Sequence, residues 1–159
     1  MSTDQLGKSA QAVQDALHAN GLQCEVKELP DTTRSAKDAA AAIGCEVREI
    51  AKSIVFRASS GIPVLVIASG TNRVNEAKVA EVLGEGVTMA SPDFVREHTG
   101  FAIGGVPPLG HPAPINTLLD EDLLRFSLVW AAAGTPFSVF SIEPQALASA
   151  TGGRVINVA

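Results

Sequence analysis

Two apolar segments joined by a tight turn constrain the fold of this chain more than any other feature. Residues 50–57 and 62–68 are rich in isoleucine and valine, and Ser59-Ser60-Gly61 lies between them. Paired apolar segments with a Ser/Gly turn are typical of a β-hairpin. Because the strands of a hairpin run antiparallel, the sequence predicts a mixed or antiparallel sheet and argues against a doubly wound parallel one.

Helix and strand signals continue along the whole chain, with no internal repeat and no linker. Capping residues such as Ser35, Asn75 and Ser91, with glycines where helices would stop, mark several helix ends. The sequence predicts helices at residues 5–20, 35–44, 75–83, 91–99 and 143–152, and further strands at residues 22–27, 87–90, 115–119, 128–133, 137–142 and 154–158. This order predicts a mixed α/β (α+β) fold with a mixed central sheet, in a single domain spanning residues 1–159.

Composition and charge exclude several classes of function. The 159 residues are 46% hydrophobic and 18% charged, which is typical of a globular protein. Aromatic residues make up 4% of the chain, too few for a platform that stacks single-stranded nucleic acid. A net charge of −5, without a helix-turn-helix that carries a basic second helix, argues against specific DNA binding.

The N-terminus and the cysteines indicate a protein of the cytoplasm. The first residues lack the positive flank and apolar run of an export signal, and no apolar segment is long enough to cross a membrane. Cys24 and Cys45 are the only cysteines, and they do not have the spacing of a metal site. We therefore expect a cytoplasmic location, no membrane association, and two reduced, mostly buried thiols.

A stiff loop at residues 101–111 is a candidate binding element. The segment opens as a short apolar strand and continues through Gly104-Gly105, Pro107-Pro108 and Gly110-His111. Glycine lets a ligand approach the main chain closely, and proline fixes the backbone without donating a hydrogen bond. Such a turn, with bare peptide N–H groups, can hold a carbonyl oxygen or a phosphate. An ordinary connection between two strands is the alternative.

The side chains offer no conventional catalytic set. Of the three histidines, His18, His98 and His111, only His111 lies in a loop of catalytic character, and a surface histidine is the alternative there. No Gly-x-Ser-x-Gly motif is present, and the adjacent carboxylates of residues 120–122 fit a helix or turn cap in water better than a metal site. The protein therefore either binds a ligand without transforming it, or hydrolyses an activated ester through positioning and electrostatics.

Several motifs together resemble the YbaK/ProX family of editing deacylases, which is similar to the editing insertion domain of bacterial prolyl-tRNA synthetases. The matching features are Thr33, residues 35–44, residues 50–56, residues 104–111 and residues 133–137, and their order and spacing carry the resemblance over nearly the whole chain. The family implies helices around a central, barrel-like sheet. It also implies hydrolysis of the ester that joins a wrong amino acid to a tRNA, typically the proline tRNA, without a metal or an organic cofactor.

The resemblance also implies roles for individual residues. Lys52 looks like the family's active-site lysine, which contacts the terminal nucleotide phosphate or the substrate backbone; a lysine whose stem lies along apolar neighbours is the alternative. Gly104 and Gly105 look like the glycines whose N–H groups polarise the ester carbonyl, while the substrate's own 2′-hydroxyl or thiol moves the proton. Other motif positions implied at the substrate site are Thr33, Ser53, Pro107, Gly110, His111, Gly134, Thr135 and Phe137.

Two departures from the family pattern bear on specificity. Many relatives carry histidine where this chain has Phe137, and some carry a hydroxyl where it has Ala132 or Ala133. Both changes make the predicted pocket more apolar, so we expect a small apolar or thiol-bearing amino acid such as alanine, cysteine or 2-aminobutyrate. The discrimination is limited, because a hydrophobic pocket separates a methylene by only about 1–3 kcal/mol.

Arg57, Arg73 and Lys78 are the predicted contacts to tRNA. They fall around the hairpin and the loop after it, and could form one basic patch; scattered solvated charges are the alternative. A small patch would meet few phosphates and give a shallow salt dependence. The expected partners are a mischarged tRNA acceptor end and a prolyl-tRNA synthetase. A non-catalytic module that binds acceptor ends, nucleotides or a synthetase is the alternative to an enzyme.

Overall fold

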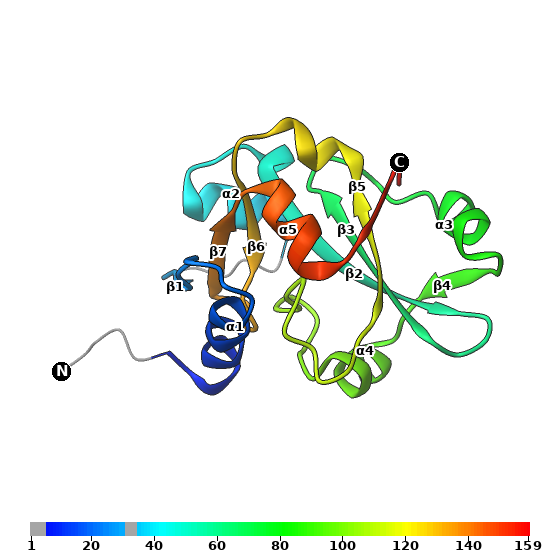
Figure 1. The fold of residues 1–159 in the computed structure, drawn as a ribbon, viewed down its shortest axis with the longest axis horizontal. Helices are drawn as coiled ribbons and strands as arrows, with labels where there is room; N and C mark the ends of the chain where they lie inside the picture. Colours follow the sequence, from blue (N-terminus) through cyan, green and yellow to red (C-terminus); the bar gives the residue numbers. More distant parts are fainter. Residues whose placement is uncertain (1–5, 31–34) are drawn as a thin grey trace.

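The computed structural model describes residues 6–30 and 35–159, and within them an eight-stranded mixed sheet lies between helices (Figure 1). The helices are α1 (Lys8–Ala19), α2 (Ala36–Ile43), α3 (Glu76–Leu83), α4 (Pro92–Thr99) and α5 (Pro144–Thr151), with the 3-10 helices η1 (Val47–Glu49) and η2 (Glu121–Arg125). The strands are β1 (Lys27–Glu28), β2 (Ile50–Ala58), β3 (Pro63–Ser69), β4 (Val87–Met89), β5 (Asn116–Asp120), β6 (Val129–Ala132), β7 (Ser138–Ile142) and β8 (Arg154–Ile156). The predicted mixed α/β fold with a central mixed sheet is confirmed.

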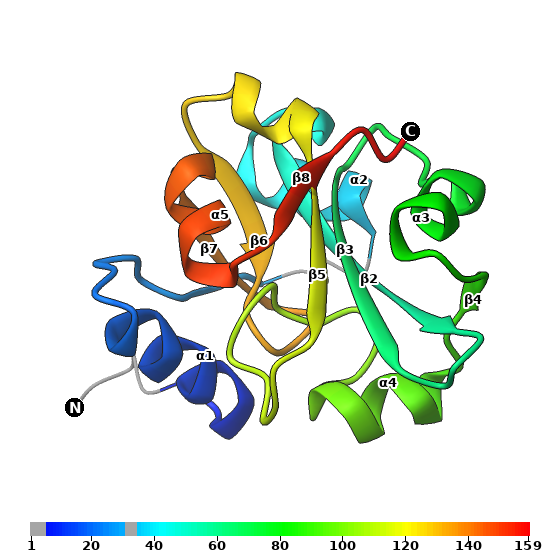
Figure 2. The same cartoon turned by 45° about the vertical axis from the view of Figure 1, so that its right-hand side comes forward.

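Strand β2 pairs with three other strands, β3 on one edge and β6 and β4 on the other. It runs antiparallel to β3 along most of its length, as the predicted hairpin requires. On its other edge it pairs in parallel with β6 at Ile50 and Ala51, and antiparallel with β4 at residues 56–58. Between these two pairings, β2 has no strand neighbour on that edge in the described part of the chain, and Figure 2 shows β6 and β4 on either side of this gap.

The strand order is β1-β7-β6-β2-β3-β5-β8, with β4 attached to β2. The pairs β2–β6, β3–β5 and β5–β8 are parallel, and the remaining pairs are antiparallel. The largest apolar cluster packs α1, α4 and α5 against β2, β3, β6 and β7. A second cluster packs α3 against β2 and β3, and a third packs α2 against Ile50 and Trp130. Helices thus pack on the apolar side chains of the sheet at each of these three clusters.

The predicted caps occupy the helix ends. Ser35 Oγ accepts a hydrogen bond from the Asp38 N–H at 3.0 Å, and Ser91 Oγ accepts one from the Phe94 N–H at 3.2 Å. The Asn75 side chain caps α3 in the same way, and α2, α3 and α4 each end at a glycine in the left-handed region. These local interactions satisfy terminal peptide groups without help from the rest of the fold, which is why the sequence predicts these helices well.

The strand predicted at residues 22–27 is largely wrong. Burial alternates along the segment as predicted, but only β1, at its end, pairs with β7. Gln14 of α1 replaces the missing ladder: its side chain donates to the Cys24 carbonyl at 2.9 Å and accepts from the Val26 N–H at 2.8 Å. An extended segment can therefore be held by one buried amide instead of by a strand.

The cysteines are less buried than the sequence predicts. Cys24 and Cys45 are both free and half-buried. Partial burial raises the pKa of each thiol above that of an ordinary cysteine. In the described ranges, no helix is long and apolar enough to span a bilayer.

Candidate functional site

A cavity of about 350 Å³ opens where β2 leaves β6. Its walls are mainly apolar side chains of α2, β2 and β6, with Val106 of the 101–111 loop. Met89 and Ile103, which are 66% and 55% exposed, also line it and place apolar surface toward solvent. The polar groups on the wall include Lys52, Ser53 and the Gly104 backbone, so the structure brings three of the predicted site residues together at one cavity.

Among the described residues, Lys52 is the cation that lines this cavity. Its side chain is half-buried, and its ammonium donates to the Gly70 carbonyl at 3.4 Å. Burial lowers the pKa of Lys52 below that of an ordinary lysine, and the nearby charge of Asp120 partly opposes that shift. A partly desolvated ammonium with one weak acceptor can act more strongly on a ligand charge than a solvated one.

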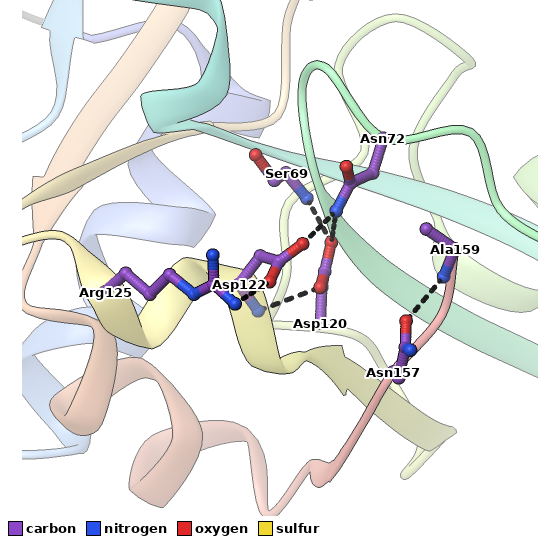
Figure 3. A network of polar contacts seen from close by, with 7 residues as sticks. All are labelled: Ser69, Asn72, Asp120, Asp122, Arg125, Asn157 and Ala159. Atoms are coloured by element: carbon purple, nitrogen blue, oxygen red, sulfur yellow. Dashed lines mark hydrogen bonds and ion pairs between the residues drawn. The ribbon is translucent and has the colours of Figure 1, made fainter.

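A buried carboxylate holds the Ser69–Asn72 turn, which carries the carbonyl that Lys52 contacts (Figure 3). Asp120 has no exposed surface, and its carboxylate accepts from the Ser69 N–H at 3.0 Å and from the Asn72 side chain at 2.8 Å. It also accepts from the Asp122 N–H at 2.9 Å and so caps η2. The predicted cap is confirmed, and Glu121 is exposed as predicted. The predicted location in water is wrong for Asp120, which is buried because it anchors the Ser69–Asn72 turn that carries the Gly70 carbonyl.

Ser53 follows Lys52 on β2 and is the second polar residue of the cavity. Its hydroxyl oxygen is buried and has no hydrogen-bond partner among the described residues. A buried polar atom without a partner is uncommon in folded proteins and marks a position where a ligand or water can bind. Ser53 therefore fits its predicted place beside the substrate.

The 101–111 loop differs from the prediction at its start. Residues 101–103 form a bend and turn instead of a strand, and the Gly105 N–H donates to the Ala102 carbonyl at 3.0 Å. The Gly105 N–H is thus used within the loop, and the expectation that both glycines offer bare N–H groups is wrong for this one. Gly104 lines the cavity with a φ of 96°, a conformation that favours glycine.

Gly105 joins this loop to the turn after β6. Its carbonyl accepts from the Gly134 N–H at 2.8 Å, and a Cβ atom at Gly105 would lie 2.8 Å from the Thr135 backbone. Thr135 Oγ1 bonds to Ser138 Oγ at 2.6 Å and accepts from the Phe137 N–H. Gly134 and Thr135 therefore support the loop that carries Gly104, and neither is on the cavity wall.

Phe137 also lies off the cavity wall, and its side chain is 44% exposed. The expectation that Phe137 makes the pocket apolar is therefore wrong. Ala132 lines the cavity as expected, whereas Ala133 is fully buried and does not. The apolar wall comes mostly from α2, β2 and β6, including Trp130, which no motif predicted.

His111 closes the loop on itself. Its Nε2 lies 2.8 Å from the Pro107 carbonyl, and its ring packs edge-on against Phe101 with the centroids 6.4 Å apart. Burial lowers the pKa of His111 below the ordinary histidine value, although the Pro107 contact opposes the shift. Gly110, with a φ of 89°, lies against α1, where a Cβ atom would be 3.2 Å from Ala16. His111, Pro107 and Gly110 are off the cavity wall and shape the loop instead.

The loop junction gives a matched pair of glycine variants. We expect Gly105→Ala to lower the free energy of unfolding by about 1–3 kcal/mol, because the new methyl group would overlap the Thr135 backbone. The same shift displaces Gly104, so hydrolytic activity falls as well. Gly86→Ala, at a non-strained backbone position with open space around it, is the control and leaves both quantities unchanged. Urea unfolding and hydrolysis assays measure the difference; equal behaviour of the two variants would contradict the close approach at Gly105.

Titration of His111 gives a stability prediction. Since the folded pKa lies below the unfolded value, the unfolded chain takes up the proton first as the pH falls below about 6.5. Stability is then lost from that pH down to the folded pKa, by up to about 1.4 kcal/mol per pH unit. Urea unfolding at about pH 7.5 and about pH 5.5 should show a smaller loss in His111→Asn than in the wild type, because asparagine cannot take up that proton. Equal losses of stability in the two proteins would refute the role of His111 in this pH dependence.

The predicted tRNA contacts do not form one patch. Arg57 is exposed near the turn end of β2, with its guanidinium 5.4 Å from the Phe94 ring centroid. Arg73 is exposed beyond the opposite end of β3, about 20 Å away at the usual rise of a strand. Lys78, at the start of α3, donates to the main-chain oxygen of Ala159. The alternative of scattered charges fits the structure better.

The remaining predictions concern Thr33 and a metal site. Thr33 lies outside the described residues. Among the residues the structure describes, no group of histidine, cysteine, aspartate or glutamate side chains has the arrangement of a metal site.

Comparisons with known proteins agree on one family. Residues 30–150 match the family model described as the aminoacyl-tRNA editing domain. YwhH of Bacillus subtilis (strain 168) is 32% identical over 131 residues, which cover 82% of this chain and 83% of YwhH. The "Putative Cys-tRNA(Pro)/Cys-tRNA(Cys) deacylase EbsC" of Enterococcus faecalis (strain ATCC 700802 / V583) is 26% identical over 125 residues, covering 78% of this chain and 76% of EbsC.

A solved structure shows how far this likeness extends. A crystal structure of "a putative trans-editing enzyme for prolyl tRNA synthetase" superposes with a TM-score of 0.92 at 46% sequence identity. The match covers 97% of this chain and 98% of that protein. The family model and the structural match together show that this chain belongs to the aminoacyl-tRNA editing domain family.

Proposed function

We propose that this protein hydrolyses the ester of a mischarged aminoacyl-tRNA in trans, with a small apolar or thiol-bearing amino acid on a proline tRNA as its substrate. Aminoacyl-tRNA editing is the activity of its family; EbsC is named as a putative deacylase, and the protein of the matching crystal structure as a putative trans-editing enzyme for prolyl-tRNA synthetase. The supporting observation is the cavity that carries Lys52, Ser53 and Gly104 on an otherwise mainly apolar wall.

The size and polarity of the cavity suit the acyl end of such a substrate. A volume of about 350 Å³ accommodates a small amino acid with part of the terminal ribose. Ala36 and Ala39 of α2 and Ala132 of β6 present methyl groups, which favour an apolar side chain over a hydroxyl. Exposed Met89 and Ile103 offer apolar surface on which the terminal adenine would lie.

The reaction needs few groups because the ester is already activated. Water attacks the carbonyl carbon, the bond to the ribose oxygen breaks, and a proton passes to that oxygen as the amino acid leaves. In our proposal the Lys52 ammonium binds the nearby phosphate or the developing negative charge, and the Gly104 N–H polarises the carbonyl. The substrate's own 2′-hydroxyl or thiol relays the proton, since none of the described residues that line the cavity is a histidine.

A panel of mischarged proline tRNAs tests this proposal. We expect hydrolysis of alanyl-, cysteinyl- and 2-aminobutyryl-tRNA, and slower hydrolysis of seryl-tRNA by roughly tenfold or more, because the wall would bury its hydroxyl. Prolyl-tRNA should be spared. Seryl-tRNA cleaved far faster than alanyl-tRNA would refute the apolar pocket. Binding of the acceptor end with no cleavage of any ester would favour a non-catalytic module instead.

A further inference from the structure

The gap in the sheet leaves one residue of β2 with neither its N–H nor its C=O paired to another strand. In an antiparallel pair, successive residues direct their N–H and C=O groups to alternate edges of the strand. The Ile50 carbonyl accepts from the Gly70 N–H and the Ala58 N–H donates to the Ile62 carbonyl, so the even-numbered residues face β3. The odd-numbered residues therefore face the edge that β6 and β4 share, where the Val55 carbonyl accepts from the Ala90 N–H at 3.2 Å.

Ser53 is the odd-numbered residue that stands in the gap. The pairing with β6 ends at Ala51, and the pairing with β4 begins at Phe56. Within the described ranges, neither the N–H nor the C=O of Ser53 has a hydrogen-bond partner. Ser53 also lines the cavity, and its buried hydroxyl is likewise without a partner. Main-chain groups that face a cavity without a partner in the protein are available to a ligand.

The arrangement matches an α-aminoacyl ester. In a hydrogen-bonded antiparallel pair, one residue exchanges both of its bonds with the N–H and C=O of the residue opposite. An aminoacyl group carries the same two functions on either side of its α-carbon, an amine that donates and a carbonyl oxygen that accepts. A side chain on that α-carbon then points away from the paired edge, as in any strand.

We propose that the Ser53 peptide binds the substrate's aminoacyl group as an opposing strand residue would, its C=O accepting from the α-ammonium and its N–H donating to the ester carbonyl. This inference rests on the proposed hydrolysis and adds recognition of the substrate's α-amino group. It also supplies a second donor to the carbonyl beside Gly104, since the Gly105 N–H is engaged by Ala102. Two main-chain donors are the usual complement for a tetrahedral oxyanion.

Acyl groups that differ only at the α-position test the carbonyl of Ser53. The wild-type protein is incubated with the proline tRNA carrying alanyl, lactyl or propionyl groups, and each rate is divided by the spontaneous rate of that ester. The lactyl group keeps a weaker donor, its α-hydroxyl, and the propionyl group has none. We therefore expect the normalised rate to fall in the order alanyl, lactyl, propionyl. Propionyl should show kcat/KM roughly 10- to 100-fold below alanyl, because the Ser53 carbonyl would be buried without a partner.

The result separates this inference from the function on which it rests. Normalised rates that are equal for alanyl and propionyl would overturn the inference while leaving deacylation in place. A protein inert on every acyl group would overturn both.

A proline at Ser53 tests the N–H. Proline is tolerated in a strand where its nitrogen needs no ladder partner, and Ser53 meets that condition. We expect Ser53→Pro to fold and to lose roughly 100-fold in kcat, the usual effect of removing one oxyanion donor. The alanyl-to-propionyl preference should persist, because the Ser53 carbonyl remains. Ser53→Ala, which loses only the hydroxyl, is the reference for this comparison.

Two further outcomes complete the test. Ile54→Pro should fail to fold, because its N–H faces β3, and this checks the assigned alternation. A folded Ser53→Pro variant as active as Ser53→Ala would overturn the role of the N–H. If Ser53→Pro does not fold, the three acyl groups on the wild-type protein decide the matter alone.

Discussion

Lys52→Ala should reduce deacylation by at least about 100-fold while leaving the fold intact. Among the residues that the structure describes, the ammonium is the cation on the cavity wall and bonds weakly to the Gly70 carbonyl at 3.4 Å, so little of the fold depends on it. Single-turnover hydrolysis of alanyl-tRNA measures the effect, and urea unfolding checks the fold. Lys52→Met, which keeps most of the aliphatic stem, should be equally inactive if the charge is what matters.

The control for Lys52 is a lysine far from the cavity. Lys8 is exposed at the start of α1, and Lys8→Ala should hydrolyse alanyl-tRNA at the wild-type rate. The wild-type rate should also fall as the pH rises through the pKa of Lys52, which lies below that of an ordinary lysine. A Lys52→Ala protein with unchanged hydrolysis would remove the central claim about this site.

Asp120→Ala should lower the free energy of unfolding by about 2–4 kcal/mol, the second large effect we expect. The substitution leaves the buried Ser69 N–H without an acceptor and removes the cap of η2 at Asp122. Asn72 keeps its bond to Asp122, which limits the loss. Urea unfolding measures the change. Asp15→Ala, at an exposed position on α1, is the control and should stay within about 0.5 kcal/mol of the wild type.

Asp120→Asn separates the charge of the carboxylate from its shape. The Asp120 charge raises the pKa of Lys52 against the effect of burial, so removing it should lower that pKa further. The alkaline limb of the hydrolysis profile would then move to lower pH in Asp120→Asn. A limb that stays in place, with the variant folded, would show that Asp120 acts only by holding the Ser69–Asn72 turn.

The local features of the fold were predictable, because local interactions specify them. Ser35, Asn75 and Ser91 cap their helices through side-chain bonds to peptide groups two or three residues away. The β2–β3 hairpin likewise depends on a short turn. Lys52 and Gly104 were predicted from motifs of a few consecutive residues, and the structure places both on the wall of one cavity.

The features that the sequence missed depend on contacts between distant segments. The parallel pairing of β3 with β5 and of β5 with β8 joins strands that no turn connects, so no local signal specifies it. The sequence predicted Asp120 as a helix cap exposed to water, because its partners Ser69 and Asn72 lie some 50 residues earlier in the chain. Gln14 replaced a predicted strand for the same reason: its partners lie in another element.

The interrupted edge of β2 also determines how its amides exchange with solvent. Lys52 and Ile54 direct their N–H groups into the ladder with β3, whereas Ser53 between them does not. In deuterated water, the Ser53 amide should therefore exchange rapidly between two protected neighbours. A ligand bound in the cavity would slow the exchange of the Ser53 amide, so this amide would report whether the cavity is occupied.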